Sequence, residues 1–255
     1  MENAVKTDLT RIGLYTIMIN RPEKRNAINF EVMEGLDEAL KQAEQDPAIK
    51  AVVIRGAGKQ AFCAGGDLKE FHVLKTAAEA HVMLSRMGSL LYRLLTIQKP
   101  TIAYINGIAV GGGCEIAAAC DIRVAHSSAK LGFVQGNQGI TTGWGGASIL
   151  FEKMPVSSAL TLLLGGEIHT AEKAKELGFI DYMISENLNG GWESLQKKIL
   201  NKESAVLTAY KKLLVQKWET SMLSDRIHAE IEECSRLWET DVHLDAVKMF
   251  REKSK

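Results

Sequence analysis

The residues best placed to do chemistry are a glycine run followed by an acid, Gly111-Gly112-Gly113-Cys114-Glu115. An apolar, partly β-branched run at 101–110 precedes them, and the alanine-rich stretch 116–120 that follows predicts a helix. A glycine turn that opens a helix leaves unpaired N–H groups at the positive end of the helix dipole, and these stabilise an anion or a developing oxyanion. Glu115 then lies on the first helical turn, where a carboxylate is favoured and is also placed to act. On spacing alone, a tight turn with no chemical role explains the glycines equally well.

Alternating strand and helix patterns surround this turn. Strands are expected at 12–20, 51–54, 101–108, 121–125, 129–134 and 179–184, with a loop at 56–67. Helices are expected at 30–45, 77–95, 147–154, 157–164 and 171–177, and helical periodicity continues after residue 191. Strands separated by helices pair mainly in parallel, so the expected fold class is α/β. We expect a mixed core over 1–190 and a helical region over 191–255.

Length and composition narrow the classes of function. The 255 residues suit one large α/β domain, and equal numbers of basic and acidic residues, 31 each, argue against nucleic acid as the main partner. No secretory signal or membrane-spanning run is visible, so a cytoplasmic protein without a membrane partner is expected. The cysteines form no CxxC and no metal-ligand spacing, so small buried thiols and no metal are expected at Cys63, Cys114, Cys120 and Cys234.

Two glycine patterns suggest a nucleotide site only superficially. Gly56-Ala57-Gly58-Lys59 resembles the end of a P-loop, but Val53 replaces its first glycine and Gln60 its Ser or Thr. After the turn at Gly111, Ile116 stands where a dinucleotide fingerprint needs its third glycine. We therefore expect no nucleotide cofactor.

Three motifs, in this order and spacing, resemble the crotonase superfamily, which is the enoyl-CoA hydratase/isomerase family. They are Asn20-Arg21-Pro22 with Arg25-Asn26-Ala27, then Ala61 to Lys69 (AFCAGGDLK), then Asn106-Gly107 through Glu115 to Cys120-Asp121. The likeness extends to Thr170–Ala174 and Leu177-Gly178. The resemblance implies a crotonase-type spiral of ββα units and a helical C-terminal trimerisation region. It also implies a homotrimer or a hexamer built as a dimer of trimers.

The resemblance also implies a substrate, an acyl-CoA thioester, and no separate cofactor. Its carbonyl oxygen would accept hydrogen bonds from the backbone N–H groups of Gly66 and Gly112 while the α-carbon gains enolate character. Glu115 would be the acid/base carboxylate. The CoA region and acyl pocket would involve Arg25, Ala27, Lys59, Cys63, Ala64, Asp67, Lys69, Trp144, Phe250 and Lys253. Arg25, Lys59 and Lys69, the expected phosphate partners, are each equally well explained as a solvated surface charge.

The match breaks at the second acid. Hydratases and Δ3,Δ2-enoyl-CoA isomerases of the family use a second glutamate twenty residues after the first, and this chain has Gln135 there. Glutamine can orient a water molecule, but it does not titrate and cannot serve as a general acid or base. Full hydratase activity is therefore not expected. Trp144 also departs from the pattern and predicts either a narrowed acyl pocket or a tryptophan packed in the core.

Three functions remain open at this stage. The first is a hydratase-like lyase or isomerase of fatty acid metabolism. The second is a decarboxylase of the methylmalonyl-CoA or ethylmalonyl-CoA type, because those relatives also carry Trp-Gly-Gly here. The third, from a different class, is a non-catalytic acyl-CoA-binding protein, which the loss of the second glutamate favours.

Overall fold

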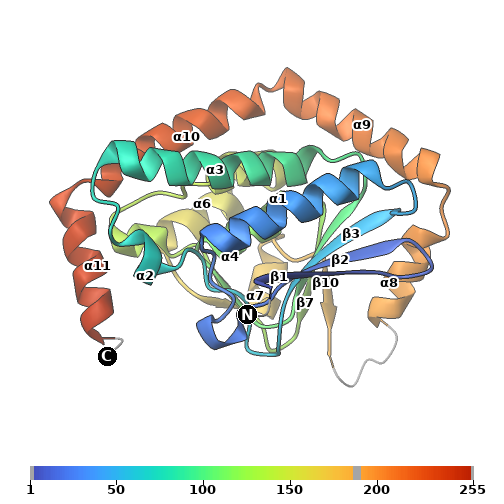
Figure 1. The fold of residues 1–255 in the computed structure, drawn as a ribbon, viewed down its shortest axis with the longest axis horizontal. Helices are drawn as coiled ribbons and strands as arrows, with labels where there is room; N and C mark the ends of the chain where they lie inside the picture. Colours follow the sequence, from blue (N-terminus) through green and yellow to red (C-terminus); the bar gives the residue numbers. More distant parts are fainter. Residues whose placement is uncertain (1–2, 186–190, 254–255) are drawn as a thin grey trace.

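The chain forms two β-sheets surrounded by helices, as a computed structural model describes it for residues 3–185 and 191–253 (Figure 1). The larger sheet has the order β1-β2-β3-β5-β7-β10, and the smaller has the order β4-β6-β8-β9. The larger sheet consists of β1 (Val5–Leu9), β2 (Leu14–Ile19), β3 (Ala51–Gly56), β5 (Thr101–Ile105), β7 (Ile122–His126) and β10 (Tyr182–Ile184). The smaller consists of β4 (Ala61–Cys63), β6 (Ile108–Val110), β8 (Lys130–Gly132) and β9 (His169–Thr170).

Strands come in consecutive pairs that alternate between the sheets. β3, β5 and β7 lie in the larger sheet, and each is followed at once by β4, β6 or β8 in the smaller one. A helix follows each pair: α2 (Leu68–Phe71) with α3 (Ala77–Thr96), then α4 (Gly112–Ala119), then α5 (Gly146–Lys153). Neighbouring strands pair in parallel except for β1 with β2 and β8 with β9. This repeated ββα order confirms the expected α/β fold class.

Helices cover the sheets, and local sequence signals mark where the long ones begin. α1 (Phe30–Gln45) begins where the Asn29 side chain accepts the Val32 N–H, and α3 begins at a capping box made by Thr76 and Glu79. In Figure 1, α9 (Ser204–Thr220) and α10 (Leu223–Trp238) arch over α3, and α11 (Asp241–Lys253) turns down beside α2. The other helices are η1 (Pro22–Lys24), η2 (Gln135–Gln138), α6 (Val156–Gly165), α7 (Ala171–Glu176) and α8 (Gly191–Leu200). None of the described helices is long and apolar enough to cross a membrane.

Several sequence expectations are wrong in detail. The single strand expected at 101–108 is two strands in different sheets, because the chain turns at Asn106-Gly107. The Asn106 side chain holds this turn by accepting the Gly56 N–H at 3.0 Å and donating to the Gly58 carbonyl at 2.8 Å. The loop expected at 56–67 contains β4, and the edge strand β1 was not expected. The strands expected at 129–134 and 179–184 shrink to β8 and β10.

The C-terminal helices are confirmed as helices α8 to α11. The boundary expected between residues 190 and 191 lies at the end of the segment 186–190, which is outside the described residues. The division into a core and a helical region therefore stays a prediction.

Candidate active site

The start of α4 explains why three glycines are needed in a row. Gly111 has φ +55°, a left-handed backbone that L side chains rarely adopt. A Cβ on Gly112 would lie 2.0 Å from Cζ3 of Trp144, and a Cβ on Gly113 would lie 2.1 Å from the Cys63 carbonyl oxygen. The glycines therefore let α4 begin directly against the β4 strand end and the Trp144 indole.

The second motif reaches the same place from β4. The bonds Ala64 N–H to Arg25 O (3.1 Å) and Ile28 N–H to Gly65 O (2.8 Å) join the loop after β4 to the loop before α1. A Cβ on Gly65 would lie 3.2 Å from the amide nitrogen of Gly112, so the two motifs are in contact. Within the described residues, neither the Gly66 nor the Gly112 N–H has a hydrogen-bond acceptor.

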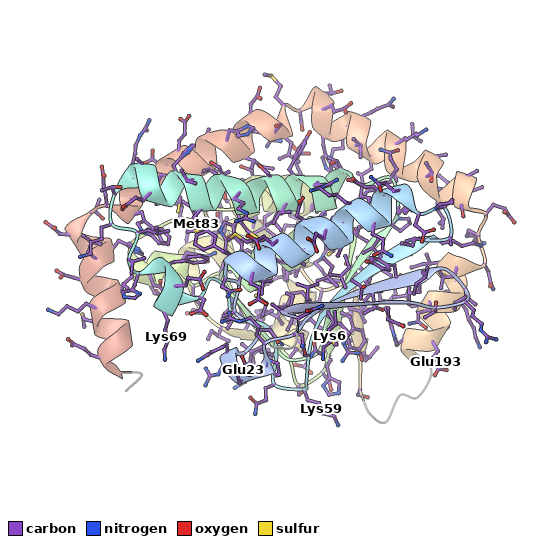
Figure 2. All side chains as sticks on the ribbon, in the orientation of Figure 1. Lys6, Glu23, Lys59, Lys69, Met83 and Glu193 are labelled. Atoms are coloured by element: carbon purple, nitrogen blue, oxygen red, sulfur yellow. The ribbon has the colours of Figure 1, made fainter. Side chains whose placement is uncertain are left out.

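Both glycines line one cavity of about 170 Å³. Apolar side chains from α2, α3 and the C-terminal helices form most of its wall, and Figure 2 shows Met83 beneath α3 on this inner side. The polar side chains among its described lining residues are those of Glu115, Gln138 and Cys234, with the indoles of Trp144 and Trp238. None of these residues carries a cationic side chain.

Glu115 is the acid of this cavity and is only 2% exposed. Its Oε2 accepts the backbone N–H groups of Trp144 and Gly146, both at 2.9 Å, and its Oε1 accepts the Gln135 side-chain amide at 2.9 Å. Burial, followed by the negative charge of Glu230, raises the pKa of Glu115 to about 7, although these three donors act in the opposite direction. Such a carboxyl group can both hold and release a proton near neutral pH.

Gln135 contacts Glu115 from η2 through its side-chain amide. Its Nε2 donates to Glu115, while its Oε1 is buried without a hydrogen-bond partner among the described residues. α11 holds η2 in place, since the ring of His243 lies 2.7 Å from the Gln138 carbonyl oxygen through Nδ1. Gln135 therefore presents one free acceptor oxygen beside the acid.

Trp144 lies in the core, which is one of the two alternatives that the sequence offered, and its indole also lines the cavity. It is 4% exposed and belongs to the main hydrophobic cluster. Its six-membered ring lies against Gly112, and a Cβ on Gly66 would be 3.8 Å from its Cζ2. The indole is therefore a wall of the cavity directly beside both glycines.

Glu230 is a carboxylate near Glu115 that the sequence reading missed. It lies on α10, where its oxygens accept the Thr142 hydroxyl at 2.5 Å and the Ser148 N–H at 2.8 Å. Burial raises the pKa of Glu230, against the effect of its donors. A signal existed, because Glu230 falls among Ile227, Ile231 and Cys234 on the buried face of the helix.

The other residues expected near CoA have varied surroundings. Ala27 and Ala64 lie in the joined loops beside Gly65. Cys63 is the last residue of β4, and burial raises the pKa of its thiol to about 12. All four cysteines are buried and free, as expected. Asp67 caps α2 through the Lys69 N–H at 3.1 Å and pairs with Arg21 at 2.9 Å, so contacts within the protein already occupy its carboxylate.

The expected phosphate partners are not gathered at one point. Arg25, Lys59 and Lys69 are all exposed, and Figure 2 shows Lys59 at the lower edge of the molecule, far from Lys69 on α2. Phe250 and Lys253 belong to α11, but their side chains lie outside the described part of the chain. The structure thus brings together Gly66, Gly112, Glu115, Gln135 and Trp144.

The chain is similar to known proteins over nearly its whole length. A family model described as Enoyl-CoA hydratase/isomerase matches residues 10–255. The chain is 31% identical over 242 residues to a short-chain-enoyl-CoA hydratase of Clostridium acetobutylicum, covering 94% of this chain and 91% of that protein. It is 35% identical over 178 residues to the mouse mitochondrial enoyl-CoA hydratase domain-containing protein 2, covering 70% of this chain and 60% of that one. A crystal structure of an enoyl-CoA hydratase/isomerase from Mycobacterium paratuberculosis superposes with a TM-score of 0.86 at 25% identity, covering 98% and 99% of the two chains.

Proposed function

Because the chain belongs to the enoyl-CoA hydratase/isomerase family, we propose that it is a short-chain acyl-CoA lyase or isomerase that works through a thioester enolate. The Gly66 and Gly112 N–H groups would form its oxyanion hole, and Glu115 would be its single acid/base carboxylate. One observation carries the proposal: the buried Glu115 shares a small cavity with two backbone N–H groups that no described residue accepts.

The oxyanion hole follows from elementary electrostatics. A thioester oxygen becomes negatively charged only as the enolate forms, so fixed donors stabilise the transition state more than the bound substrate. Gly112 is the first residue of α4, where the helix dipole adds to the effect of its N–H. The apolar wall of the cavity strengthens both interactions because it excludes water.

The size of the cavity favours a short acyl group. Its volume of about 170 Å³ equals roughly five or six water molecules, at about 30 Å³ each. Trp144 limits the space beside Gly112, and Phe71 and Trp238 line it elsewhere. The similarity to a short-chain-enoyl-CoA hydratase supports the same substrate class.

Glu115 would transfer one proton to or from the α-carbon. In hydration, Gln135 would orient the water through its unpartnered Oε1 but could not remove the water proton. We therefore expect weak hydration of crotonyl-CoA compared with an enzyme that has two glutamates.

Decarboxylation of a substituted malonyl-CoA is the second candidate. The C–C bond to the carboxylate breaks, CO2 leaves, and the remaining enolate takes a proton from Glu115 at the α-carbon. This reaction needs an oxyanion hole and one acid but no activated water. The apolar lining without a cation among its described residues favours this reaction, because a carboxylate entering it loses solvation without gaining a partner.

A small panel of CoA esters watched by mass spectrometry tests both candidates. Butyryl-CoA in D2O reports enolate formation by α-deuterium uptake, crotonyl-CoA reports hydration, and methylmalonyl-CoA and ethylmalonyl-CoA report decarboxylation. Glu115→Gln should abolish whichever activity is found. Tight binding of these esters without deuterium uptake, hydration or CO2 release would instead support the non-catalytic acyl-CoA-binding protein.

Self-association into trimers or a dimer of trimers is part of the same proposal. α6 exposes an apolar stripe at four-residue spacing, Val156, Leu160 and Leu164, which are 57%, 38% and 81% exposed. Such a stripe on a soluble chain favours burial against another subunit. Sedimentation velocity of the wild-type chain and of Leu164→Glu tests it, and an unchanged monomeric mass for both would refute it.

A further inference from the structure

Two carboxylates on different helices, Glu115 of α4 and Glu230 of α10, bind the same short backbone segment. The segment runs from Thr142 to Ser148 and contains the start of α5. Glu115 accepts the N–H groups of Trp144 and Gly146, each at 2.9 Å. Glu230 accepts those of Ala147 at 3.2 Å and Ser148 at 2.8 Å. The donors that fix the acid of the cavity and those that bind Glu230 therefore all lie between Trp144 and Ser148.

Thr142 connects Glu230 to the beginning of this segment. Its hydroxyl donates to Glu230 at 2.5 Å and accepts the Ala147 N–H at 3.1 Å. Thr142 is 3% exposed, so water does not compete for these bonds. A Cβ on Gly146 would lie 2.6 Å from Cγ of Glu115, so the segment is packed directly on the acid that it binds.

We propose, on the basis of the function inferred above, that Glu230 is a positioning residue for Glu115. It fixes the segment 142–148 over the acid and, as the more solvated of two neighbouring carboxylates, takes the negative charge while Glu115 keeps the proton.

The difference in burial decides which carboxyl group is charged. Glu115 is 2% exposed, whereas Glu230 keeps some exposure on α10, although burial raises the pKa of Glu230 as well. Desolvation penalises the charge more strongly at Glu115, and the start of α5 favours one negative charge nearby. Two interacting carboxyl groups titrate as a pair, so the first proton leaves from the better solvated site.

The other titratable groups around Glu115 leave this assignment unchanged. Cys63 of β4, Cys114 of α4 and Cys234 of α10 are buried, and burial raises the pKa of each thiol, so all three are neutral. α3 contributes Met83 and Leu84 to the cavity and no charge. On the far side of η2, burial lowers the pKa of His243, so this ring is neutral at neutral pH as well.

The consequence is an acid ready to donate. Glu115 transfers its proton to the α-carbon of the enolate, a C–H bond forms, and the carboxylate left behind regains a proton from solvent. While Glu115 is ionised, the charge of Glu230 favours this return. Without Glu230, Glu115 would lose its proton at lower pH and a smaller fraction of the enzyme would be ready at neutral pH.

Infrared titration of the purified protein tests the inference without any substrate. The protonated-carboxyl band absent from Glu115→Gln belongs to Glu115, and its loss with rising pH gives the midpoint. Glu230→Gln keeps the size and one of the two acceptor oxygens but removes the charge, and should shift this midpoint downward by about one pH unit. For the panel substrate that the enzyme converts, the alkaline limb of the pH profile of kcat should shift to lower pH by the same amount, and KM should be unchanged.

Two further variants separate charge from structure. Glu230→Asp retains the charge and should titrate close to the wild type. Glu152→Gln removes a carboxylate at the other end of α5, where it pairs with Arg226 and Lys217, and should leave the midpoint unchanged. A wild-type midpoint in Glu230→Gln, or an equal shift in Glu230→Asp, would overturn the inference. Failure of the panel to show turnover would overturn the proposed function and leave the titration result standing.

Discussion

The free energy of unfolding of the Glu115→Gln variant, compared with that of the wild type, should rise as the pH increases. Glutamine has nearly the same shape, and its amide oxygen can accept the Trp144 and Gly146 N–H groups that Glu115 Oε2 accepts. Its NH2 group then faces Gln135, whose unpartnered Oε1 can accept from it after the amide rotates. The substitution therefore removes an ionisable group at little cost in hydrogen bonds.

The magnitude follows from the pKa of Glu115, which burial raises from 4.5 to about 7. Between these values the folded chain binds a proton that the unfolded chain has released, so the free energy of unfolding falls as the pH rises. The contribution is complete below the unfolded pKa and is lost as the pH passes the folded pKa. At about 1.4 kcal/mol per unit, the wild type loses about 2.5 kcal/mol between pH 5 and pH 8 through this group.

Urea unfolding at pH 5 and pH 8 measures this loss. Protein concentration is held fixed, because the stability of an assembly depends on it. The difference between Glu115→Gln and the wild type should grow by about 2.5 kcal/mol in favour of the variant at pH 8. Glu38→Gln, a change of an exposed glutamate on α1, is the matched control and should show no such growth. A difference that is equal at the two pH values would mean that Glu115 is ionised in the folded state, and the burial argument would be wrong.

Three further substitutions test the cavity. Gly112→Ala places a Cβ 2.0 Å from the Trp144 ring and should lower the free energy of unfolding by about 3 kcal/mol, measured with urea. When Trp144 is already replaced by alanine, the same Gly112→Ala change should cost much less. An equal loss with and without the Trp144 indole would refute the clash. Trp144→Ala should lower the free energy of unfolding by about 3–5 kcal/mol. It should also raise kcat/KM for hexenoyl-CoA relative to crotonyl-CoA, and an unchanged ratio would show that the indole does not limit the length of the acyl group. Gln135→Glu should raise crotonyl-CoA hydration at least about tenfold by supplying a second titrating group, with Gln138→Glu as the control; no gain would contradict the missing-base explanation.

The sequence predicted long periodic elements well and short ones poorly. α1 has the predicted bounds, and α3 differs by one residue, because each carries an apolar stripe and a clear N-cap. β4 and β6 have three residues each, too few for a periodic pattern, and they exist because parallel pairing in the second sheet supports them. The Asn-Gly turn at 106–107 was a visible signal that the surrounding apolar run obscured.

The same limits apply to the site. The family resemblance singled out Gly66, Gly112, Glu115 and Gln135 by their motif positions, and the structure places them close together. Glu230 was missed because it lies 115 positions after Glu115 on a helix, and only the packing of α10 on α5 brings the two carboxylates to one segment. No local pattern encodes such a contact, although a glutamate within an apolar helix face indicates that a buried partner exists.

Glu230 also gives a physical reason why glutamine suits position 135. Nε2 of Gln135 lies 2.9 Å from Glu115, and a carboxylate there would form a second like-charge pair with an acid that already has Glu230 nearby. Ionising both Glu115 and a glutamate at position 135 would be costly, because the described lining of the cavity holds no cation. These two carboxyl groups would therefore share one proton. With glutamine at 135, Glu115 keeps a hydrogen-bond donor at this position, and the carboxylate that influences it, Glu230, lies on α10. The described lining of the cavity then holds one carboxyl group, that of Glu115, and this would suit a reaction that transfers one proton better than one that must also deprotonate water.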